Sequence, residues 1–308
     1  MMIDDGLLDI LRCPLCRQGL KTEPAGLRCL NASCARLYPV DDGIPVMLAD
    51  NRLERELGLT RDKWMQNYSL APEKVSIEGD ICLQDSDRFL RRFISLENGG
   101  LYLEAGCGMA KNALLLCRGG LKVVGVDICL NALKKAKAIF ESEGRKGYFI
   151  CADMNFLPLK DNLFDYVYAG GSLEHFPDTQ RAAGELNRVL APCGRLISTV
   201  PVISLSTLTY GQLSGNIPDL PVLRQLAEFF QIKLLRKKFM VYGYEKSFTA
   251  GKVIRILRRA GFTDIEWGPY HTHWEIKFFK SQAVKSLLRR LTRLRAFWPF
   301  IYATAKKA

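Results

Sequence analysis

The residues with the clearest chemistry are four cysteines near the N-terminus, with the spacing C-x2-C-x12-C-x4-C: Cys13, Cys16, Cys29 and Cys34. Two closely spaced pairs of thiolates supply the four ligands of a tetrahedral structural zinc ion. A segment of about 50 residues has little core of its own, so the metal would supply much of its folding free energy. The spacing predicts a zinc ribbon over residues 1–50. The alternative is four buried cysteines without a metal.

A glycine-rich turn is the second feature that could do chemistry. The apolar residues 101–103 predict a buried strand, and Gly106 and Gly108 follow in a turn where a missing Cβ lets a ligand approach the backbone. Glu104 precedes the first glycine. A carboxylate there would repel a pyrophosphate group but suits a ligand that carries an ammonium group, so the turn does not indicate a dinucleotide site.

The elements that follow place a second carboxylate near this turn. Residues 110–118 predict a short helix, and 123–126 predict a second strand that ends in Asp127. An acidic residue at the end of a second strand can bind the hydroxyl groups of a ribose.

The order of these motifs resembles the class I S-adenosylmethionine (SAM)-dependent methyltransferases over residues 80–201. The turn EAGCGMA resembles their motif I, and CADMNFLPLKDNLFDYVY, AGGSLEHFPD and ELNRVLAPCGRLISTV follow in order. The resemblance implies an α/β fold, a Rossmann-like seven-stranded sheet with helices on both faces, and a SAM-dependent methyltransferase. It implies cofactor contacts at Glu104, Gly106, Gly108, Asp127, Ile128, Asp153, Met154 and Gly170.

Three positions in this region carry further expectations. Ala110 replaces the usual third glycine, and we expect it to be tolerated because the helix has begun and φ is negative. Asp165 is expected to be structural. His175 is the candidate catalytic residue, since a neutral imidazole beyond the fourth strand can accept a proton from an acceptor hydroxyl or amine. The alternative for His175 is local packing and hydrogen bonding.

The cysteine-rich segment also resembles a family. Residues 7–48 contain LLDILRCPLC and LYPVDDGIPVML, and they resemble the small zinc-ribbon proteins that activate tRNA and protein methyltransferases. The second cysteine pair departs from that family, which often has two intervening residues. The resemblance implies a structural or docking zinc and a ribbon that is not the catalyst.

Basic residues are concentrated in the C-terminal quarter. Residues 224–308 contain 19 Lys and Arg and 5 Asp and Glu, whereas the other 223 residues have a net charge of −2. Within this quarter, residues 280–298 have an apolar stripe with arginines and lysines beside it. Such a helix is typical of one lying on an anionic membrane, and the alternative is a helix packed on the domain. Phe297 and Trp298 would add interfacial anchoring.

These features predict the organisation of the chain. We expect a ribbon at 1–50, a linker with helices at 51–98, and a methyltransferase domain at 99–308 with a cap insertion at 202–245. With 48% hydrophobic and 25% charged residues the chain is not disordered. The N-terminus does not resemble a signal peptide, so we expect a cytoplasmic protein whose cysteines are thiols or metal ligands.

Three functions remain open at this point. The first is a methyltransferase whose acceptor is a small or lipid- or glycan-linked molecule handled near the cytoplasmic membrane. The second is an RNA methyltransferase that holds RNA with the ribbon and the basic C-terminus, although no Asn/Asp-Pro-Pro-Tyr motif follows the fourth strand. The third is a non-catalytic scaffold. The sequence identifies neither the acceptor nor the oligomeric state.

Overall fold

The computed structural model describes residues 3–48, 61, 64–66, 68, 77–97, 99–209, 216–234, 245–270 and 279–308. The predicted domain boundary at residue 50 and much of the predicted linker lie outside these residues.

A mixed seven-stranded sheet forms the centre of the molecule, in the order β13-β14-β10-β9-β6-β7-β8. Five neighbouring strands, β10, β9, β6, β7 and β8, are parallel, and β14 runs antiparallel to both β10 and β13. The bounds are β6 Leu101–Ala105, β7 Lys122–Asp127, β8 Tyr148–Cys151, β9 Phe164–Gly170, β10 Leu190–Pro201, β13 Phe262–Tyr270 and β14 Phe300–Lys307. This is the seven-stranded Rossmann-like sheet that the sequence predicts.

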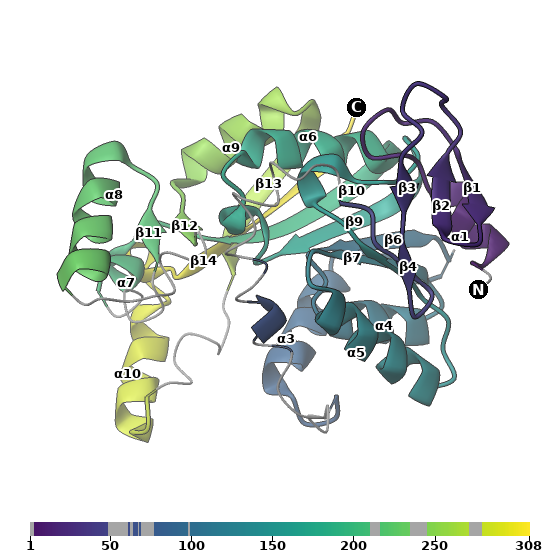
Figure 1. Ribbon diagram of the computed structural model, residues 1–308. Coiled ribbons are helices and arrows are strands. Elements are labelled where there is room, and N and C mark those ends of the chain that lie inside the picture. The colour runs from purple at the N-terminus through teal and green to yellow at the C-terminus, as the bar shows by residue number, and fades with distance from the viewer. Residues whose placement is uncertain are drawn as a thin grey trace.

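Helices cover both faces of this sheet (Figure 1). One face carries α3, α4 and α5, and the other carries α6 and α9. The bounds are α3 Ile81–Leu90, α4 Lys111–Arg118, α5 Leu130–Ser142, α6 Thr179–Val189 and α9 Ala250–Arg259. Polar side chains at the N-caps accept hydrogen bonds from the first turns of α3, α6 and α9, namely Asp80, Asp178 and Thr249.

The ribbon contains one short helix and two small sheets. Helix α1 spans Asp5–Ile10, a three-stranded sheet has the order β1-β2-β3, and β4 pairs with β5 in a hairpin. The strands are β1 Leu20–Glu23, β2 Gly26–Cys29, β3 Leu37–Tyr38, β4 Val40–Asp41 and β5 Ile44–Pro45.

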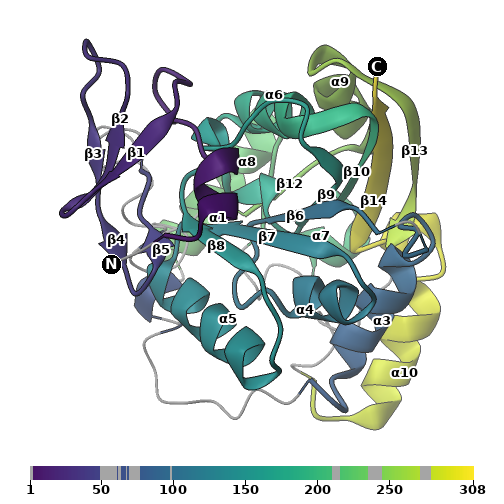
Figure 2. The same ribbon diagram turned by 90° about the vertical axis from the view of Figure 1, so that its right-hand side faces the viewer.

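The ribbon lies against the β8 edge of the large sheet (Figure 2). Val46 forms a parallel bridge with Cys151 of β8, and the Met47 amide donates to the Cys151 carbonyl at 2.7 Å. Leu11 forms an antiparallel bridge with Leu159. Buried apolar residues of the ribbon and of the sheet form one continuous cluster. The ribbon therefore shares the hydrophobic core of the large domain.

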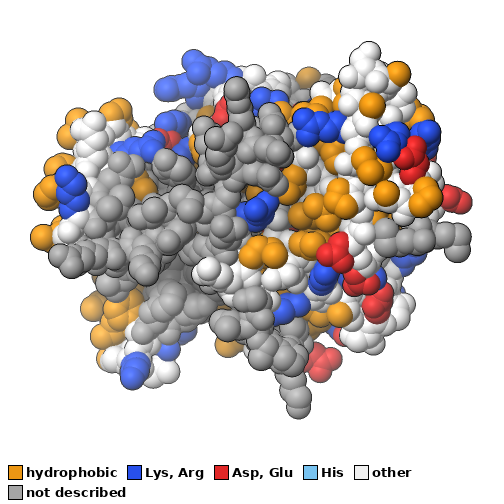
Figure 3. Space-filling model, in the orientation of Figure 1, with side chains coloured by type: hydrophobic (Ala, Val, Ile, Leu, Met, Phe, Trp, Pro, Cys, Tyr) orange, Lys and Arg blue, Asp and Glu red, His pale blue; other side chains and the backbone are white. Residues whose placement is uncertain are grey.

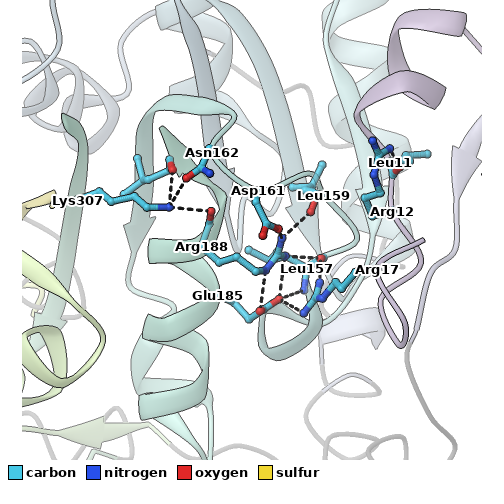
Figure 4. A network of polar contacts seen from close by, with 11 residues as sticks. Leu11, Arg12, Arg17, Leu157, Leu159, Asp161, Asn162, Glu185, Arg188 and Lys307 are labelled. Carbon is cyan, nitrogen blue, oxygen red and sulfur yellow. Dashed lines mark hydrogen bonds and ion pairs between the residues drawn. The ribbon is translucent and has the colours of Figure 1, made fainter. Parts of the chain in front are cut away.

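Polar contacts reinforce this junction (Figure 4). The Arg17 guanidinium donates to the Leu157 carbonyl at 2.6 Å and pairs with the Glu185 carboxylate of α6. Four exposed aspartates of the ribbon also pair with lysines of the domain: Asp4–Lys146, Asp9–Lys160, Asp41–Lys134 and Asp42–Lys137. Exposed pairs contribute little individually, so the buried contacts dominate.

The chain leaves the sheet after β10 and forms the described part of the insertion. It contains α7 Leu205–Leu208, β11 Ile217–Pro218, α8 Pro221–Glu228 and a π-helical turn, η4, Phe229–Leu234. β11 pairs with β12, Lys246–Ser247. The basic segment forms α10, Gln282–Leu291, and the turn η7, Arg295–Phe297. None of the described helices is long and apolar enough to cross a membrane.

The expectation for Ala110 is wrong. Ala110 has φ of 52°, a left-handed conformation, so it enters α4 from the strained position that glycine would occupy more easily. Among the cysteines outside the ribbon, Cys107, Cys129 and Cys151 are buried, whereas Cys193 is exposed within β10, with φ of 61°, where the pairing of β10 with β9 shifts register.

Candidate cofactor and metal sites

The strand order reverses between β6 and β9, and the predicted cofactor residues lie at or just beyond the carboxyl ends of β6, β7, β8 and β9. In open α/β sheets, ligands bind at such a switch point. Gly106 has φ of 76°, and a Cβ there would lie 2.6 Å from the Ser172 Cβ. The turn after β6 therefore passes so close to the segment after β9 that only glycine fits.

Asp127 holds the glycine turn in place. Its Oδ2 accepts a hydrogen bond from the Gly108 amide at 2.7 Å, and its Oδ1 accepts one from the Cys129 amide at 2.8 Å. Burial raises the pKa of this carboxyl. Asp127 thus lies beside the turn, with further acceptor capacity on both oxygens.

Glu104 is buried beneath the start of α4. Its carboxylate accepts from the Ala113 amide at 2.8 Å and from the Asn112 side chain at 3.1 Å, so it caps the helix. Burial raises the pKa of Glu104 to about 7. Glu104 therefore caps α4. A cationic ligand beside Glu104 would favour the charged form of this carboxyl group.

Asp153 and Met154 lie on the other side of the site, where Asp153 is the N-cap of the turn η1, Met154–Phe156. Asp153 Oδ1 accepts from the Asn155 amide at 2.8 Å, while Oδ2 is buried without a hydrogen-bond partner among the described residues. Burial raises the pKa of Asp153 to about 6. The Met154 Cε lies 3.7 Å from the position of a Cβ on Gly106.

The unpartnered atoms mark a place that a polar ligand would fill. The Ser172 hydroxyl and the Asn155 side-chain oxygen are also buried without partners in the described part of the chain. Buried polar groups are nearly always hydrogen-bonded, so unpaired groups beside a glycine turn fit a bound polar ligand. The residues thus fit a nucleoside-containing cofactor.

Two further residues of the predicted cofactor site, Ile128 and Gly170, make contacts within the fold itself. The Ile128 carbonyl accepts from the Cys151 thiol at 3.5 Å. A Cβ on Gly170 would overlap the Tyr168 ring, so this glycine makes room for a buried tyrosine. Asp165 is structural, as expected, because its carboxylate accepts from the Leu101 amide at the start of β6.

His175 ends the turn η2, Leu173–His175, beyond β9. Its ring packs edge-on against Trp64, with 5.8 Å between ring centroids. The adjacent Glu174 is buried, and its Oε2 has no hydrogen-bond partner among the described residues. Burial raises the pKa of Glu174 well above its ordinary value. Lys246 of β12, the residue directly after the insertion, donates to the carbonyls of Phe176 and Pro177, so the end of the insertion lies beside this loop.

Sequence reasoning did not find the aromatic side chains over this site. The Tyr68 hydroxyl lies 2.8 Å from the position of a Cβ on Gly108, and Trp64 stacks near Tyr68 as well as His175. Both residues precede β6 by more than 30 positions and belong to no motif. Only the tertiary fold brings them to the turn.

The four cysteines of the ribbon converge. Their Sγ atoms all lie within 4.8 Å of one another, with 3.3 Å between Cys16 and Cys29 and 3.7 Å between Cys13 and Cys34. Thiolates about 2.3 Å from a tetrahedral zinc ion lie roughly 3.8 Å apart, so the donor set fits this metal. The Tyr38 hydroxyl is 3.1 Å from the Cys13 sulfur and would hydrogen-bond to that ligand.

Comparisons with known proteins match two separate parts of the chain. Residues 103–198 match the methyltransferase domain family, and residues 4–43 match the Trm112p-like protein family. Methyltransferase GfsG of Streptomyces halstedii is 31% identical over 180 residues, which cover 52% of this chain and 64% of that protein. Demethylmenaquinone methyltransferase of Thermus thermophilus is 38% identical over 97 residues, 31% of this chain and 44% of that protein. The chain thus covers less than two thirds of these relatives.

Solved structures share the fold. The PH0226 protein of Pyrococcus horikoshii aligns with 79% of this chain and 99% of its own, with a TM-score of 0.54 and 20% identity. The cysteine cluster lies within the region that matches the Trm112p-like family, and the glycine turn lies within the region that matches the methyltransferase family. This chain therefore combines an N-terminal segment that is similar to Trm112p-like proteins with a central segment that is similar to the methyltransferase domain.

Proposed function

We propose that the protein is a SAM-dependent methyltransferase that carries its own zinc ribbon. The observation that supports this most is the turn at Gly106 and Gly108, which Asp127 tethers beside the unpartnered Asp153 and Ser172 oxygens. A bound SAM would supply an activated methyl group. Alignment of the acceptor with that group would provide much of the rate enhancement.

Each predicted residue has a role in this proposal. Asp127 would accept hydrogen bonds from the ribose hydroxyls, and Glu104 would face the ammonium group. Asp153 would accept from the adenine amino group, next to the apolar Met154. Gly106, Gly108, Ile128 and Gly170 would shape the backbone around the cofactor, and Cys13, Cys16, Cys29 and Cys34 would hold the zinc.

We infer that the elements that follow β9 and β10 bind the methyl acceptor. His175 would take the proton from an acceptor hydroxyl or amine, and the neighbouring insertion would select the acceptor. Exposed leucine and phenylalanine side chains of this insertion favour a small or lipid- or glycan-linked amphiphile handled at an anionic membrane. The basic C-terminus supports RNA as the alternative acceptor.

A transfer assay tests this proposal. Purified protein is incubated with methyl-labelled SAM and with separate lipid, glycan and RNA pools. We expect label in the lipid or glycan pool, and label confined to RNA would support the alternative. Absence of SAM binding by calorimetry would contradict the methyltransferase assignment itself.

A further inference from the structure

Exposed large apolar side chains gather in the insertion and the basic segment. Among the described residues, twelve such side chains lie between positions 205 and 294, and four lie elsewhere. Helix α7 exposes Leu205 and Leu208, the α8–η4 segment exposes Leu226 and Phe229, and α10 with the following turn exposes Leu287 and Leu294. Neither α8 nor α10 has a buried residue among those described.

These elements lie at one end of the molecule. Helices α8 and α10 occupy the left end in Figure 1, with α7 between them, and the ribbon lies at the opposite end. Figure 3 shows apolar side chains at this end, both above over α8 and below over α10. The Ser206 hydroxyl of α7 donates to the Phe297 carbonyl of η7, which fixes α7 beside the turn that follows α10.

The same end carries unbalanced positive charge. Arg289, Arg290 and Arg293 are exposed, and no carboxylate within the described ranges forms an ion pair with any of them. Residues 280–298 contain six Lys and Arg and no Asp or Glu. Apolar side chains flanked by unpaired cations are the composition of an interfacial surface.

The geometry points to a membrane-docking surface, formed by α7, α8–η4 and α10, that binds the anionic face of a lipid bilayer. The apolar side chains enter the boundary between headgroups and acyl chains, and the arginines contact lipid phosphates. Nucleic acid would use the arginines but would leave exposed leucines and phenylalanines on several elements without a role. The combination therefore favours lipid.

Trp298 is not part of this surface, contrary to the expectation from the sequence. It is half-buried and packs against the core, and its indole nitrogen is buried. The Arg295 guanidinium lies over the ring of Trp267 in β13, 5.4 Å from the ring centroid. The leucines of α10 and the side chains of α8–η4 provide the apolar contact.

The docking surface lies at the same end of the sheet as the candidate cofactor site. Pro201, which ends β10, pairs with Phe300, which begins β14. The insertion leaves β10 at this point and the segment containing α10 enters β14 there, at the carboxyl ends of the parallel strands. Docking would therefore bring the cofactor end of the domain toward the bilayer. This orientation rests on the proposed function, whereas lipid binding does not.

Vesicle co-sedimentation tests the surface. The full chain is mixed with vesicles of phosphatidylcholine alone or with about one third phosphatidylglycerol, at low salt. The variant Leu226→Ser/Leu287→Ser removes one apolar side chain from each of α8 and α10. Its matched control is Leu30→Ser/Ile81→Ser, because Leu30 and Leu287 are both 58% exposed, and Ile81 and Leu226 are 61% and 60% exposed.

We expect the wild type and the control to bind the anionic vesicles equally, and the docking variant to bind about tenfold more weakly. Both variants should melt at the wild-type temperature, since the replaced side chains are exposed. Failure of the wild type to sediment with anionic vesicles, or equal losses in both variants, would overturn the inference. A melting temperature lowered only in the docking variant would also overturn it, because these leucines would then be packed. SAM titration without vesicles tests the proposed function separately.

Discussion

The Nη2 of Arg17 lies 2.7 Å from the Oε2 of Glu185, and this ion pair joins the ribbon to helix α6. The same carboxylate accepts a hydrogen bond from the Leu157 amide at 2.9 Å, and Arg188 contacts it from within α6. Arg17 also donates to the Leu157 carbonyl. Leu157 ends the turn that begins at Asp153. The ribbon therefore holds the loop that carries one side of the candidate cofactor site.

Removal of Arg17 tests this connection. Arg17→Ala should lower the free energy of unfolding by about 1–2 kcal/mol, because two hydrogen bonds to buried partners are lost while Arg188 still pairs with Glu185. Urea denaturation measures the change, and hydrogen exchange should speed up over residues 153–159. Arg28→Ala is the control, since Arg28 pairs with Glu23 inside the ribbon. Equal exchange in the two variants would contradict the connection.

Zinc removal should affect the whole chain. The ribbon and the sheet share one apolar cluster, so loss of the metal should destabilise both parts together. We expect one zinc per chain by elemental analysis, and a single unfolding transition that shifts to lower temperature after chelation or in Cys13→Ser. A separate early transition that leaves the main one unmoved would show that the ribbon folds independently.

Glu104 should make stability depend on pH. Its pKa is raised from 4.5 to about 7 by burial, so the folded state holds a proton that the unfolded state releases across this range. Its contribution to stability therefore falls as pH rises from about 4.5 to 7 and is fully lost above 7. This loss is about 3 kcal/mol. Melts of wild type and Glu104→Gln at pH 5 and pH 8 should show the variant gaining relative stability at pH 8. No relative gain would mean that the carboxyl is not desolvated.

Gly106 should tolerate no side chain while Ser172 is present. A Cβ at this position would meet the Ser172 Cβ at 2.6 Å, so Gly106→Ala should cost about 1–3 kcal/mol through this overlap and the positive φ. Ser172→Gly should recover the part due to overlap. A double-mutant cycle by urea denaturation measures this coupling. Additive effects would mean that the turn does not approach Ser172 in solution.

Much of the fold could be predicted from the sequence because its signals are local. Apolar runs and the glycine turn indicated β6, α4 and β7 in the right order. The cysteine spacing indicated the cluster of Cys13, Cys16, Cys29 and Cys34. The motif order indicated which carboxylates approach the glycine turn.

The remaining features depend on tertiary contacts. Ala110 adopts a left-handed conformation that its residue type does not predict. Trp298 packs against the core, although the basic amphipathic segment that precedes it predicts a position at a membrane interface. Trp64 and Tyr68 reach the site from a distant segment. Periodicity does not specify which surfaces meet.

Calorimetric titration of SAM into wild type and Asp127→Ala tests the central claim most directly. We expect the wild type to bind SAM and the variant to bind it about five- to hundredfold more weakly, because the ribose hydroxyls lose their acceptor. Asp127→Asn keeps one acceptor oxygen and should lie between them, and melting curves verify that each variant is folded. No SAM binding by the wild type, or unchanged affinity in a folded Asp127→Ala, would contradict the account.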